Sequence, residues 1–380
     1  MTSIRPADPL RGELLRRIRA GADAPISDAE FNTLALAVFG HQYEQNVAYR
    51  AYCKRRGASP ESVRQWTEIP AVPTAAFKAA PLVCGDPAQA RAVFHTSGTT
   101  AGAERRGRHY FPDLTLYDAA LRESFRAHLL PEGARLRMLS LVPARAEMPH
   151  SSLAHMIAEV MEEFGGAGSG GYMREGALDH AGLTQALREA EASGEPVLLL
   201  GTSFAYVHLL DALRQREERF RLPGGSRLMD TGGFKGRSRE VTREELYREL
   251  GEALGIPPEW CVNEYGMTEM SSQFYDAVAG DPGAAAVSER LHHAPPWVRT
   301  RATDPETLAL LPDGSEGILR HWDLANLDSV LAIQTEDWGG CHPAGFRVLG
   351  RAAGAEARGC SIATDELLSA LAARRGGESR

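Results

Sequence analysis

The sequence predicts an α/β protein that combines a large region of helices and parallel-rich sheet with a small β-rich subdomain. Between residues 90 and 265, short apolar runs alternate with amphipathic helical segments, which is the pattern of a parallel sheet covered by helices. From about residue 297 the predicted elements become shorter and strand-like. The length of 380 residues is sufficient for two or three domains or for one large one.

We expect four regions along the chain. Residues 1–80 form a helical N-terminal region packed on the core, and residues 81–296 form the α/β core. Residues 297–365 form the β-rich subdomain, and residues 366–380 form a C-terminal helix or tail.

The N-terminal region is predicted to be helical over residues 10–57, because apolar side chains recur near the 3.6-residue helical period. In the core, a helix over 113–129 has Asp113 as its N-cap, and a second helix begins at Ser151 or Ser152 with an apolar stripe that runs to Phe164. The other expected core elements are strands over 137–142, 197–202 and 227–230, a helix that runs to Leu213, and a helix over 240–254. The expected strands of the β-rich subdomain cover 297–303, 316–322, 329–335 and 346–350.

Composition excludes several classes of protein. A formal net charge of −8 argues against a nucleic-acid binder, which would present a basic face. No window approaches the roughly 18 uninterrupted apolar residues of a membrane span, and residues 1–6 lack the apolar segment of a signal peptide. The five cysteines show no paired spacing, so we expect free thiols and a cytoplasmic location; they are Cys53, Cys84, Cys261, Cys341 and Cys360.

A hydroxyl- and glycine-rich segment follows the apolar residues 92–94. It comprises Thr96, Ser97, Gly98, Thr99 and Thr100. Glycines allow a tight turn in which backbone N–H groups and hydroxyls converge on one anion, so the segment is a candidate phosphate-binding loop. The alternative is a polar turn between two elements. If residues 96–102, 201–203 and 231–236 all follow strands of one sheet, they should gather at the ligand-binding edge.

Two familiar nucleotide signatures can be set aside. No GxxxxGK[ST] pattern occurs, so a P-loop NTPase is excluded. The glycine-rich residues 165–171 follow a predicted helix, whereas a dinucleotide-binding fingerprint follows a strand. That segment is therefore interpreted as a flexible connection.

Two further segments carry candidate nucleotide ligands. In the first, Tyr265 can stack on a purine, Thr268 can hold a phosphate oxygen and Glu269 can bind Mg²⁺. In the second, Asp337 is expected at a strand end, where its carboxylate can accept both ribose hydroxyls. Each segment taken alone is equally compatible with an ordinary turn.

In this order, the three segments resemble the adenylate-forming superfamily of acyl-CoA synthetases and their relatives. A narrower resemblance is to the acyl-protein synthetases, the fatty-acid-activating component of bacterial bioluminescence systems, and it extends over roughly residues 60–365. Further family-like segments are Ile69–Pro73, Phe77–Lys78, Pro149–Leu153, Gly232–Gly236, Gly350–Arg351 and Arg358–Ser361.

The resemblance implies a role for each candidate residue. Thr96, Ser97, Gly98, Thr99 and Thr100 would hold the β- and γ-phosphates of ATP. The remaining assignments are Gly232 and Gly233 to the adenine and acyl pocket, Tyr265 and Gly266 to adenine, Thr268 to the α-phosphate, Glu269 to Mg²⁺, Asp337 to ribose, and Arg351 to ribose or phosphate. His150 would lie near the substrate carboxylate, although a structural histidine is equally compatible with its position.

The sequence departs from the larger superfamily at its C-terminal end. Those enzymes carry an additional C-terminal domain whose lysine contacts the carboxylate and the α-phosphate, whereas here 19 residues follow Ser361 and none is a lysine. The candidates for the missing cation are Lys235, which is our first choice, Lys78 and Arg351. An exposed solubilising lysine is the alternative interpretation of Lys235.

Cys360 is the candidate acyl acceptor. It follows Arg358 in a glycine-flanked turn, where a cationic neighbour favours the thiolate, and in the bioluminescence relatives a cysteine close to the C-terminus takes the acyl group. The alternative is a small buried apolar residue. Cys341 and His342 together are too few for a metal site.

The predicted function is therefore ATP-dependent activation of a carboxylic acid, with a fatty acid favoured, as acyl-AMP, followed by transfer to a protein thiol. ATP and Mg²⁺ are the expected cofactors, and an acyl reductase or acyl-carrier protein is the expected partner. The alternatives are an adenylating ligase for an aromatic or small acid that uses CoA or a carrier protein, and a non-catalytic acyl- or nucleotide-binding subunit.

Overall fold

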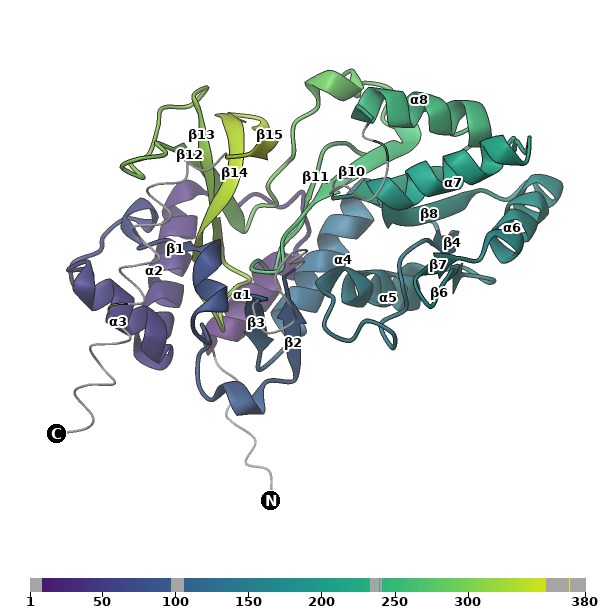
Figure 1. Cartoon of the computed structure of the whole chain (residues 1–380). Coiled ribbons are helices and arrows are strands. Elements are labelled where there is room, and N and C mark those ends of the chain that lie inside the picture. The colour runs from purple at the N-terminus through teal and green to yellow at the C-terminus, as the bar shows by residue number, and fades with distance from the viewer. Residues whose placement is uncertain (1–8, 97–105, 233–238, 240, 353–368, 370–380) are drawn as a thin grey trace. The chain divides into compact units, whose positions relative to one another are not determined.

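The computed structural model describes residues 9–96, 106–232, 239, 241–352 and 369 (Figure 1). The chain divides into two compact units that interleave along the sequence, whereas the sequence analysis expects contiguous domains. Unit 1 comprises Met1–Ala120, Met267–Ser272 and Ala294–Arg380, and unit 2 comprises Leu121–Gly266 and Gln273–His293. Helix α4 (Thr115–Leu129) begins in unit 1 and continues into unit 2.

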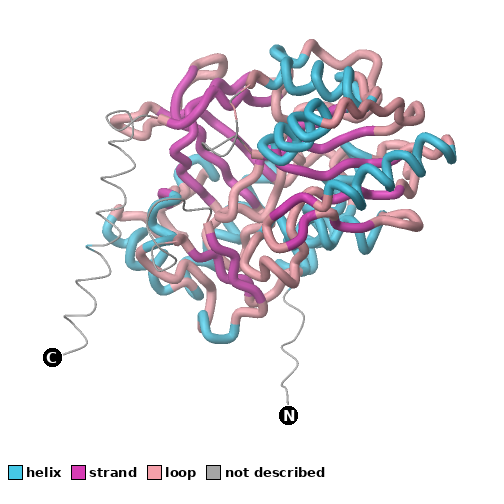
Figure 2. Tube along the Cα trace, turned by 45° about the vertical axis from the view of Figure 1, so that its right-hand side comes forward, coloured by secondary structure: helices cyan, strands magenta, loops and turns pink. Residues whose placement is uncertain are grey.

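Unit 2 is built on a mostly parallel sheet with the strand order β11-β10-β9-β8-β4-β5. Its strands are β4 (Arg137–Ser140), β5 (Gly170–Gly171), β8 (Val197–Thr202), β9 (Arg227–Thr231), β10 (Cys261–Tyr265) and the antiparallel β11 (Phe274–Tyr275). Figure 2 shows these strands running side by side. The central strands β8, β9 and β10 are buried along almost their whole length, as a sheet covered on both faces requires. The prediction of a parallel α/β layer is confirmed.

Helices complete the layers of unit 2. They are α5 (Ser152–Phe164), α6 (His180–Ser193), α7 (Ser203–Gln215) and α8 (Arg243–Leu254), with short strands β6 (Met173–Arg174) and β7 (Ala177–Leu178) between α5 and α6 and 3₁₀ turns η5 (Pro258–Trp260) and η6 (Val287–Glu289) after α8. Side chains of α6, α7 and α8 share one buried cluster with β8 and β9, while Figure 1 shows α5 on the opposite side of the sheet.

Local sequence explains where these helices begin. Ser151 is the N-cap of α5, and its side chain accepts a hydrogen bond from Ala154 N at 3.2 Å, which agrees with the predicted helix start at Ser151 or Ser152. Thr242 and Glu245 form a reciprocal capping box at the start of α8. The sequence analysis did not predict α6 or β5, and β5 lies in the glycine-rich segment that was interpreted as a connection.

Unit 1 combines the N-terminal helices with a second, mainly antiparallel sheet. Its helices are α1 (Pro9–Arg19), α2 (Asp28–Gln45) and α3 (Val47–Arg55), followed by 3₁₀ turns η1 (Trp66–Glu68), η2 (Thr74–Lys78) and η3 (Pro87–Gln89). The sheet has the order β1-β14-β13-β12, with β15 also paired to β14. Its strands are β1 (Val72–Pro73), β12 (Val298–Thr303), β13 (Glu316–Asp323), β14 (Ala332–His342) and β15 (Gly345–Arg351). The predicted β-rich segment after residue 297 is present.

Two expectations about strand positions are wrong. Strand β2 (Ala92–His95), which precedes the hydroxyl-rich segment, forms a separate hairpin with β3 (Arg108–Phe111), and within the described ranges it pairs with no strand of the parallel sheet. Asp337 lies inside the eleven-residue β14 and not at a strand end. Gly339 and Gly340 suggest a turn in the sequence, yet both continue the strand. The neighbouring strands β13 and β15 approach Gly339 so closely that a side chain would not fit there, which explains the glycine.

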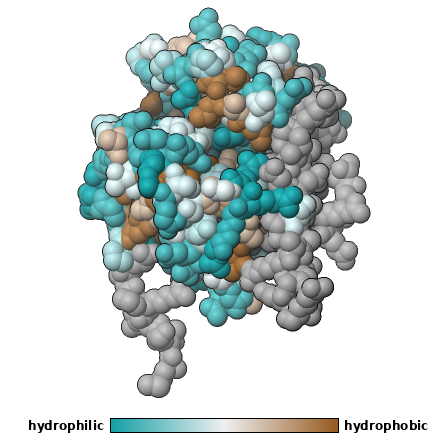
Figure 3. Space-filling model, turned by 90° about the vertical axis from the view of Figure 1, so that its left-hand side faces the viewer, coloured by the Kyte–Doolittle hydropathy of each residue, from teal (hydrophilic) through white to brown (hydrophobic). Residues whose placement is uncertain are grey.

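The surface carries few large apolar side chains. Among the described residues, Val47, Met148 and Leu349 are the exposed ones, and Figure 3 shows hydrophilic residues interspersed with separate hydrophobic areas on one face. No helix in the described ranges combines the length and hydrophobicity needed to cross a bilayer.

A buried glutamine in α2 fixes a loop of unit 1. The Gln42 amide donates to the carbonyls of Asn326 and Leu327 at 2.8 and 3.2 Å, and its oxygen accepts from Leu331 N at 2.9 Å. One side chain thus satisfies three backbone groups of the turn between β13 and β14. Buried backbone groups without such partners would be costly.

We expect Gln42→Leu to lower the free energy of unfolding by about 2–4 kcal/mol, because three buried backbone groups lose their partner. Urea titration followed by circular dichroism measures this change. The exposed Gln45→Leu, on the same helix, is the matched control and should change stability by less than about 0.5 kcal/mol. Equal stability of the two variants would contradict this role of Gln42.

Candidate active site

The segment that contains Thr268 and Glu269 is anchored inside unit 1. Asp323, at the end of β13, accepts from Ser271 N at 3.0 Å and from Ser272 Oγ at 2.8 Å. Asn326 donates to the Glu269 carbonyl at 2.9 Å and accepts from Ser271 Oγ at 2.6 Å. All of these groups are buried, so residues 269–272 are held by a network that water does not weaken.

The β2–β3 hairpin contacts the same segment. Thr268 Oγ1 donates to the His95 carbonyl at 3.5 Å, and His109 Nδ1 donates to the Thr268 carbonyl at 2.8 Å. Beyond the last pair of the ladder, Thr96 N donates to the Gly107 carbonyl and Gly107 N donates to Thr96 Oγ1, both at 2.9 Å. The Thr96 hydroxyl therefore closes the neck of the hairpin as an acceptor, and its own proton can still be donated to an anion.

Glu269 is the centre of a charged cluster in unit 1. Its carboxyl is buried, and burial raises its pKa to about 7; Arg351 opposes this shift, while Asp337 and Glu336 add to it. Arg351 is paired in register with Asp337 across β14 and β15, with 3.7 Å between its Nε and Asp337 Oδ1. A terminal nitrogen of Arg351 lies 4.0 Å from Glu336 Oε2.

Unit 1 thus brings together five of the predicted site residues: Thr96, Thr268, Glu269, Asp337 and Arg351. Four others belong to unit 2: His150, Gly232, Tyr265 and Gly266. The remaining predicted positions lie outside the described residues; they are Ser97, Gly98, Thr99, Thr100, Gly233, Lys235 and Cys360.

In unit 2, the carboxyl ends of β9 and β10 meet through a buried carboxyl. Glu264 is paired in register with Thr231, whose hydroxyl donates to Glu264 Oε2. Burial raises the Glu264 pKa to about 7. A Cβ at Gly266 would come too close to Glu264 Oε1, so any other residue there would make this carboxyl shift. Gly232, which follows Thr231, has a φ of +71°, a conformation that favours glycine.

A second buried network supports these strand ends. Asp230 accepts from Ser203 Oγ at 2.8 Å, from Tyr247 Oη, and from Asn263 Nδ2 at 3.1 Å. His292 and Asn263 are joined through Nε2 and Oδ1 at 2.9 Å. The network therefore links β9, α7, α8 and β10, and it fixes the segment from which Tyr265 emerges.

The sequence alone does not identify these supporting residues, although it contains weak signals for them. Asp230 and Asn263 stand at the ends of apolar runs, which are typical ligand or support positions in α/β sheets. Asp323 and Asn326 follow Trp322, the last residue of a predicted strand, and both residue types are common in turns. Their partners, however, are distant in sequence and are identified only by the fold.

Tyr265 and His150 are placed differently. The Tyr265 ring is half-buried, with centroids 5.7 Å from Phe274 and 5.6 Å from His292. His150 is exposed and directly precedes the N-cap of α5.

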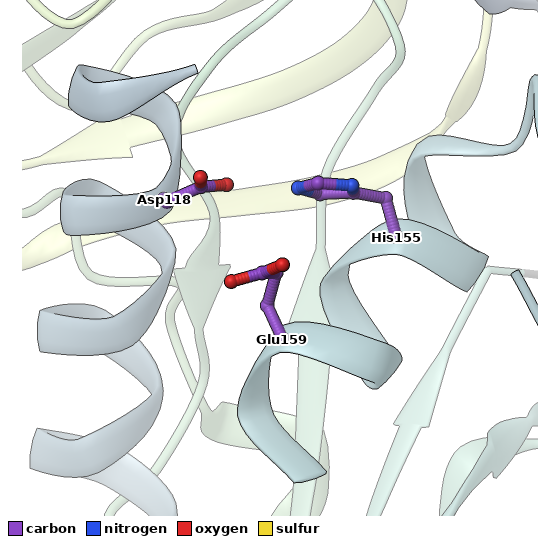
Figure 4. Close-up of side chains that lie close together, drawn as sticks. All are labelled: Asp118, His155 and Glu159. Atoms are coloured by element: carbon purple, nitrogen blue, oxygen red, sulfur yellow. The ribbon is translucent and has the colours of Figure 1, made fainter. Parts of the chain in front are cut away.

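Figure 4 shows His155 and Glu159 one turn apart on α5; Asp118, also drawn, belongs to unit 1. The Glu159 carboxylate is already bound by two guanidinium groups of unit 2, from Arg122 at 2.6 Å and from Arg145 at 2.8 Å. These ion pairs neutralise the charge that a metal would need, so we assign Glu159 a structural role.

Cys341, which the sequence pairs with too few ligands for a metal site, lies in β14. Its side chain is buried, and burial raises its pKa to about 11, which keeps the thiol protonated. The other described cysteines, Cys53, Cys84 and Cys261, are free.

Comparison with known families identifies the chain's relatives. The model of the acyl-protein synthetase family, LuxE, matches residues 26–369. The chain belongs to this family. It is accordingly a ligase that activates a carboxylic acid with ATP and transfers the acyl group to protein.

Two curated acyl-protein synthetase relatives are long-chain-fatty-acid–luciferin-component ligases. The one from Vibrio harveyi is 22% identical over 310 residues, covering 80% of this chain and 78% of the relative. The one from Aliivibrio fischeri is 23% identical over 317 residues, with the same coverage of 80% and 78%.

Solved structures confirm the adenylate-forming fold of this acyl-protein synthetase. A 2-hydroxyisobutyryl-CoA ligase, in complex with 2-HIB-AMP and CoA, superposes with a TM-score of 0.62 at 16% identity, covering 86% of this chain and 71% of that chain. ATP-bound MatB from Rhodopseudomonas palustris gives a TM-score of 0.50 at 19% identity, covering 69% of this chain and 48% of that chain.

We expect Glu264→Gln to remove a pH-dependent penalty on stability. The pKa of Glu264 in the folded protein is raised to about 7, so the folded state favours the neutral carboxyl. The stabilisation that this neutral carboxyl adds to the free energy of unfolding is complete below the unfolded-state pKa and is lost as the pH rises through 7. At pH 8 the variant should therefore unfold with a free energy about 3 kcal/mol higher than wild type, and at pH 4 the two should be nearly equal.

Urea unfolding at pH 4 and pH 8 measures this difference. The exposed Glu259→Gln, also in unit 2, is the control and should follow wild type at both pH values. A pH-independent difference between Glu264→Gln and wild type would contradict the raised pKa.

Proposed function

We propose that this acyl-protein synthetase activates a long-chain fatty acid as acyl-AMP in a site centred on Glu269, and then passes the acyl group to Cys360 and on to a partner protein. The fatty acid is proposed because both curated relatives are named for that substrate. The observation that supports the site is the cluster of Glu269, Asp337 and Arg351 in unit 1.

The donor set of this cluster fits Mg²⁺. Glu269 is a buried carboxyl that interacts electrostatically with two further carboxylates, Asp337 and Glu336. Concentrated negative charge on hard oxygen atoms is stabilised by a small divalent cation. When bound, Mg²⁺ would supply charge neutralisation at the phosphates.

The remaining groups bind and orient the nucleotide. Asp337 would accept the ribose hydroxyls once its contact with Arg351 opens, and the freed guanidinium would then offer a fork of donors to a phosphate. Thr268 and the hairpin loop that begins at Thr96 would donate to phosphate oxygens. Gly232, Tyr265 and Gly266 of unit 2 stay the proposed adenine-binding residues that the sequence predicts.

The proposed chemistry has two steps. The carboxylate oxygen of the acid attacks the α-phosphorus of ATP, the bond to the bridging oxygen breaks, and pyrophosphate leaves. In the second step a thiolate attacks the acyl carbon and AMP leaves with the electron pair of the broken bond. Positioning and charge neutralisation account for most of the rate of the first step.

Three predicted residues complete the proposal. Lys235 is proposed as the cation at the transferring phosphate, Cys360 as the thiol that takes the acyl group, and His150 as a neighbour of the acid carboxylate. The proposed final acceptor is an acyl reductase or an acyl-carrier protein in the cytoplasm.

We expect Glu269→Gln to lower acid-dependent ATP–pyrophosphate exchange by at least about 100-fold, because the metal-binding charge at the α-phosphate is lost. Exchange is measured with a panel of fatty, aromatic and small acids. The exposed Glu306→Gln in unit 1 is the control and should exchange like wild type.

The same panel separates the alternatives. Exchange with aromatic or small acids alone would replace the fatty-acid assignment by that of a small-acid ligase. No exchange with any acid would indicate a non-catalytic binding subunit. Full exchange by Glu269→Gln would refute the placement of Mg²⁺.

We expect Cys360→Ala to abolish the hydroxylamine-labile acyl group on the protein while leaving pyrophosphate exchange unchanged, because the thiol acts only after acyl-AMP has formed. Incubation with ATP and radiolabelled fatty acid, followed by peptide mapping, measures this. Cys53→Ala, at a buried thiol, is the control and should retain the label. Retention of the labile acyl group by Cys360→Ala would assign the acceptor elsewhere.

A further inference from the structure

A buried histidine of β3 lies between the hairpin and the Glu269 segment of unit 1. The His109 side chain is 1% exposed. Its ring packs against Phe111, at 4.1 Å between centroids, and against Phe77, at 5.6 Å. The packing fixes the plane of the ring and therefore the direction of its two nitrogens.

The hydrogen bond from His109 defines its protonation state. Nδ1 lies 2.8 Å from the Thr268 carbonyl, which can only accept, so Nδ1 carries the proton. Burial lowers the His109 pKa to about 4, so the ring is neutral around neutral pH. The hydrogen bond to the Thr268 carbonyl raises the His109 pKa, but the effect of burial is larger.

This bond holds the residue that precedes the proposed Mg²⁺ ligand. The carbonyl of Thr268 is fixed by His109 and the next carbonyl, of Glu269, is fixed by Asn326 at 2.9 Å. Two consecutive carbonyls with fixed directions determine the backbone at Glu269, and with it the origin of the Glu269 side chain.

The same bond determines the position of the hairpin relative to this segment. Thr268 Oγ1 donates to the carbonyl of His95 on β2. His109 lies on the neighbouring strand β3, where it is paired in register with Phe94 of β2. Both strands of the hairpin are therefore tied to Thr268. The long Thr268 contact, at 3.5 Å, is the weaker of the two ties.

We propose that His109 is a positioning residue for adenylation: through its Nδ1–H it holds the hairpin that begins the phosphate-binding loop at a fixed distance from the backbone of Glu269. This inference rests on the proposed function of Glu269 and of the hairpin loop. His109 touches no substrate in this role and acts through Thr268.

Three substitutions distinguish this role from simple packing. In His109→Asn the amide nitrogen can take the place of Nδ1 and donate to Thr268. In His109→Gln the amide nitrogen lies closer to the place of Nε2, which points away from that carbonyl. His109→Phe keeps an aromatic ring against Phe77 and Phe111 but has no donor.

The experiment measures Mg·ATP affinity by isothermal titration calorimetry without acid, and acid-dependent pyrophosphate exchange, for the three variants and wild type. We expect His109→Gln and His109→Phe to lose about tenfold in kcat/KM for ATP, and His109→Asn to stay within about threefold of wild type. The rate of acyl transfer from chemically synthesised acyl-AMP to the protein thiol, with release of AMP, should be unchanged for all three. The exposed His342→Asn is the control and should match wild type.

The outcomes are decisive in either direction. Equal losses in His109→Asn and His109→Gln, in step with their melting temperatures, would show a packing role and overturn the proposal. Wild-type ATP affinity and exchange in His109→Phe would also overturn it. If wild type binds Mg·ATP but exchanges with no acid, the proposed function fails, and the affinities of the three variants still decide the role of His109.

Discussion

The anchoring of residues 268–272 within unit 1 is the constraint on which the proposed site depends. This segment interrupts unit 2 in the sequence, between Gly266 and Gln273, yet Asp323 and Asn326 bind it to the turn after β13. Gln42 of α2 fixes the same turn through three backbone groups. Helix α2 therefore contributes to the geometry of Glu269, although none of its residues belongs to a nucleotide motif.

Buried carboxyls recur at the ends of strands in both units. Asp323 and Glu264 each close a strand, and burial raises their pKa values to about 6 and 7. Such groups are expensive to bury, and each is compensated by hydroxyl or backbone donors. Polar networks of this kind favour a single arrangement of the loops that they connect, which is a requirement for electrostatic preorganisation.

The sequence was sufficient to predict the parallel layer of unit 2, since alternating apolar runs and capped helices are local signals. It also selected the residues that unit 1 gathers, because their order along the chain resembles a known family. It could not reveal that β2 forms a hairpin with β3, or that Asp337 lies within a long strand opposite Arg351, because strand partners are set by the fold as a whole. His109 was missed for the same reason: a lone histidine has no motif, and its partner lies 159 residues away.

The central claim is that Glu269 and Asp337 of one unit hold the metal and the ribose of the same nucleotide. A crystal structure of the protein with Mg²⁺ and a non-hydrolysable acyl-AMP mimic tests it most directly. The account predicts a Glu269 carboxylate oxygen within about 2.1 Å of the metal, or bonded to a water that the metal binds, and both ribose hydroxyls on Asp337, with Arg351 turned away from that carboxylate. A nucleotide bound elsewhere, with Asp337 still paired to Arg351, would contradict it.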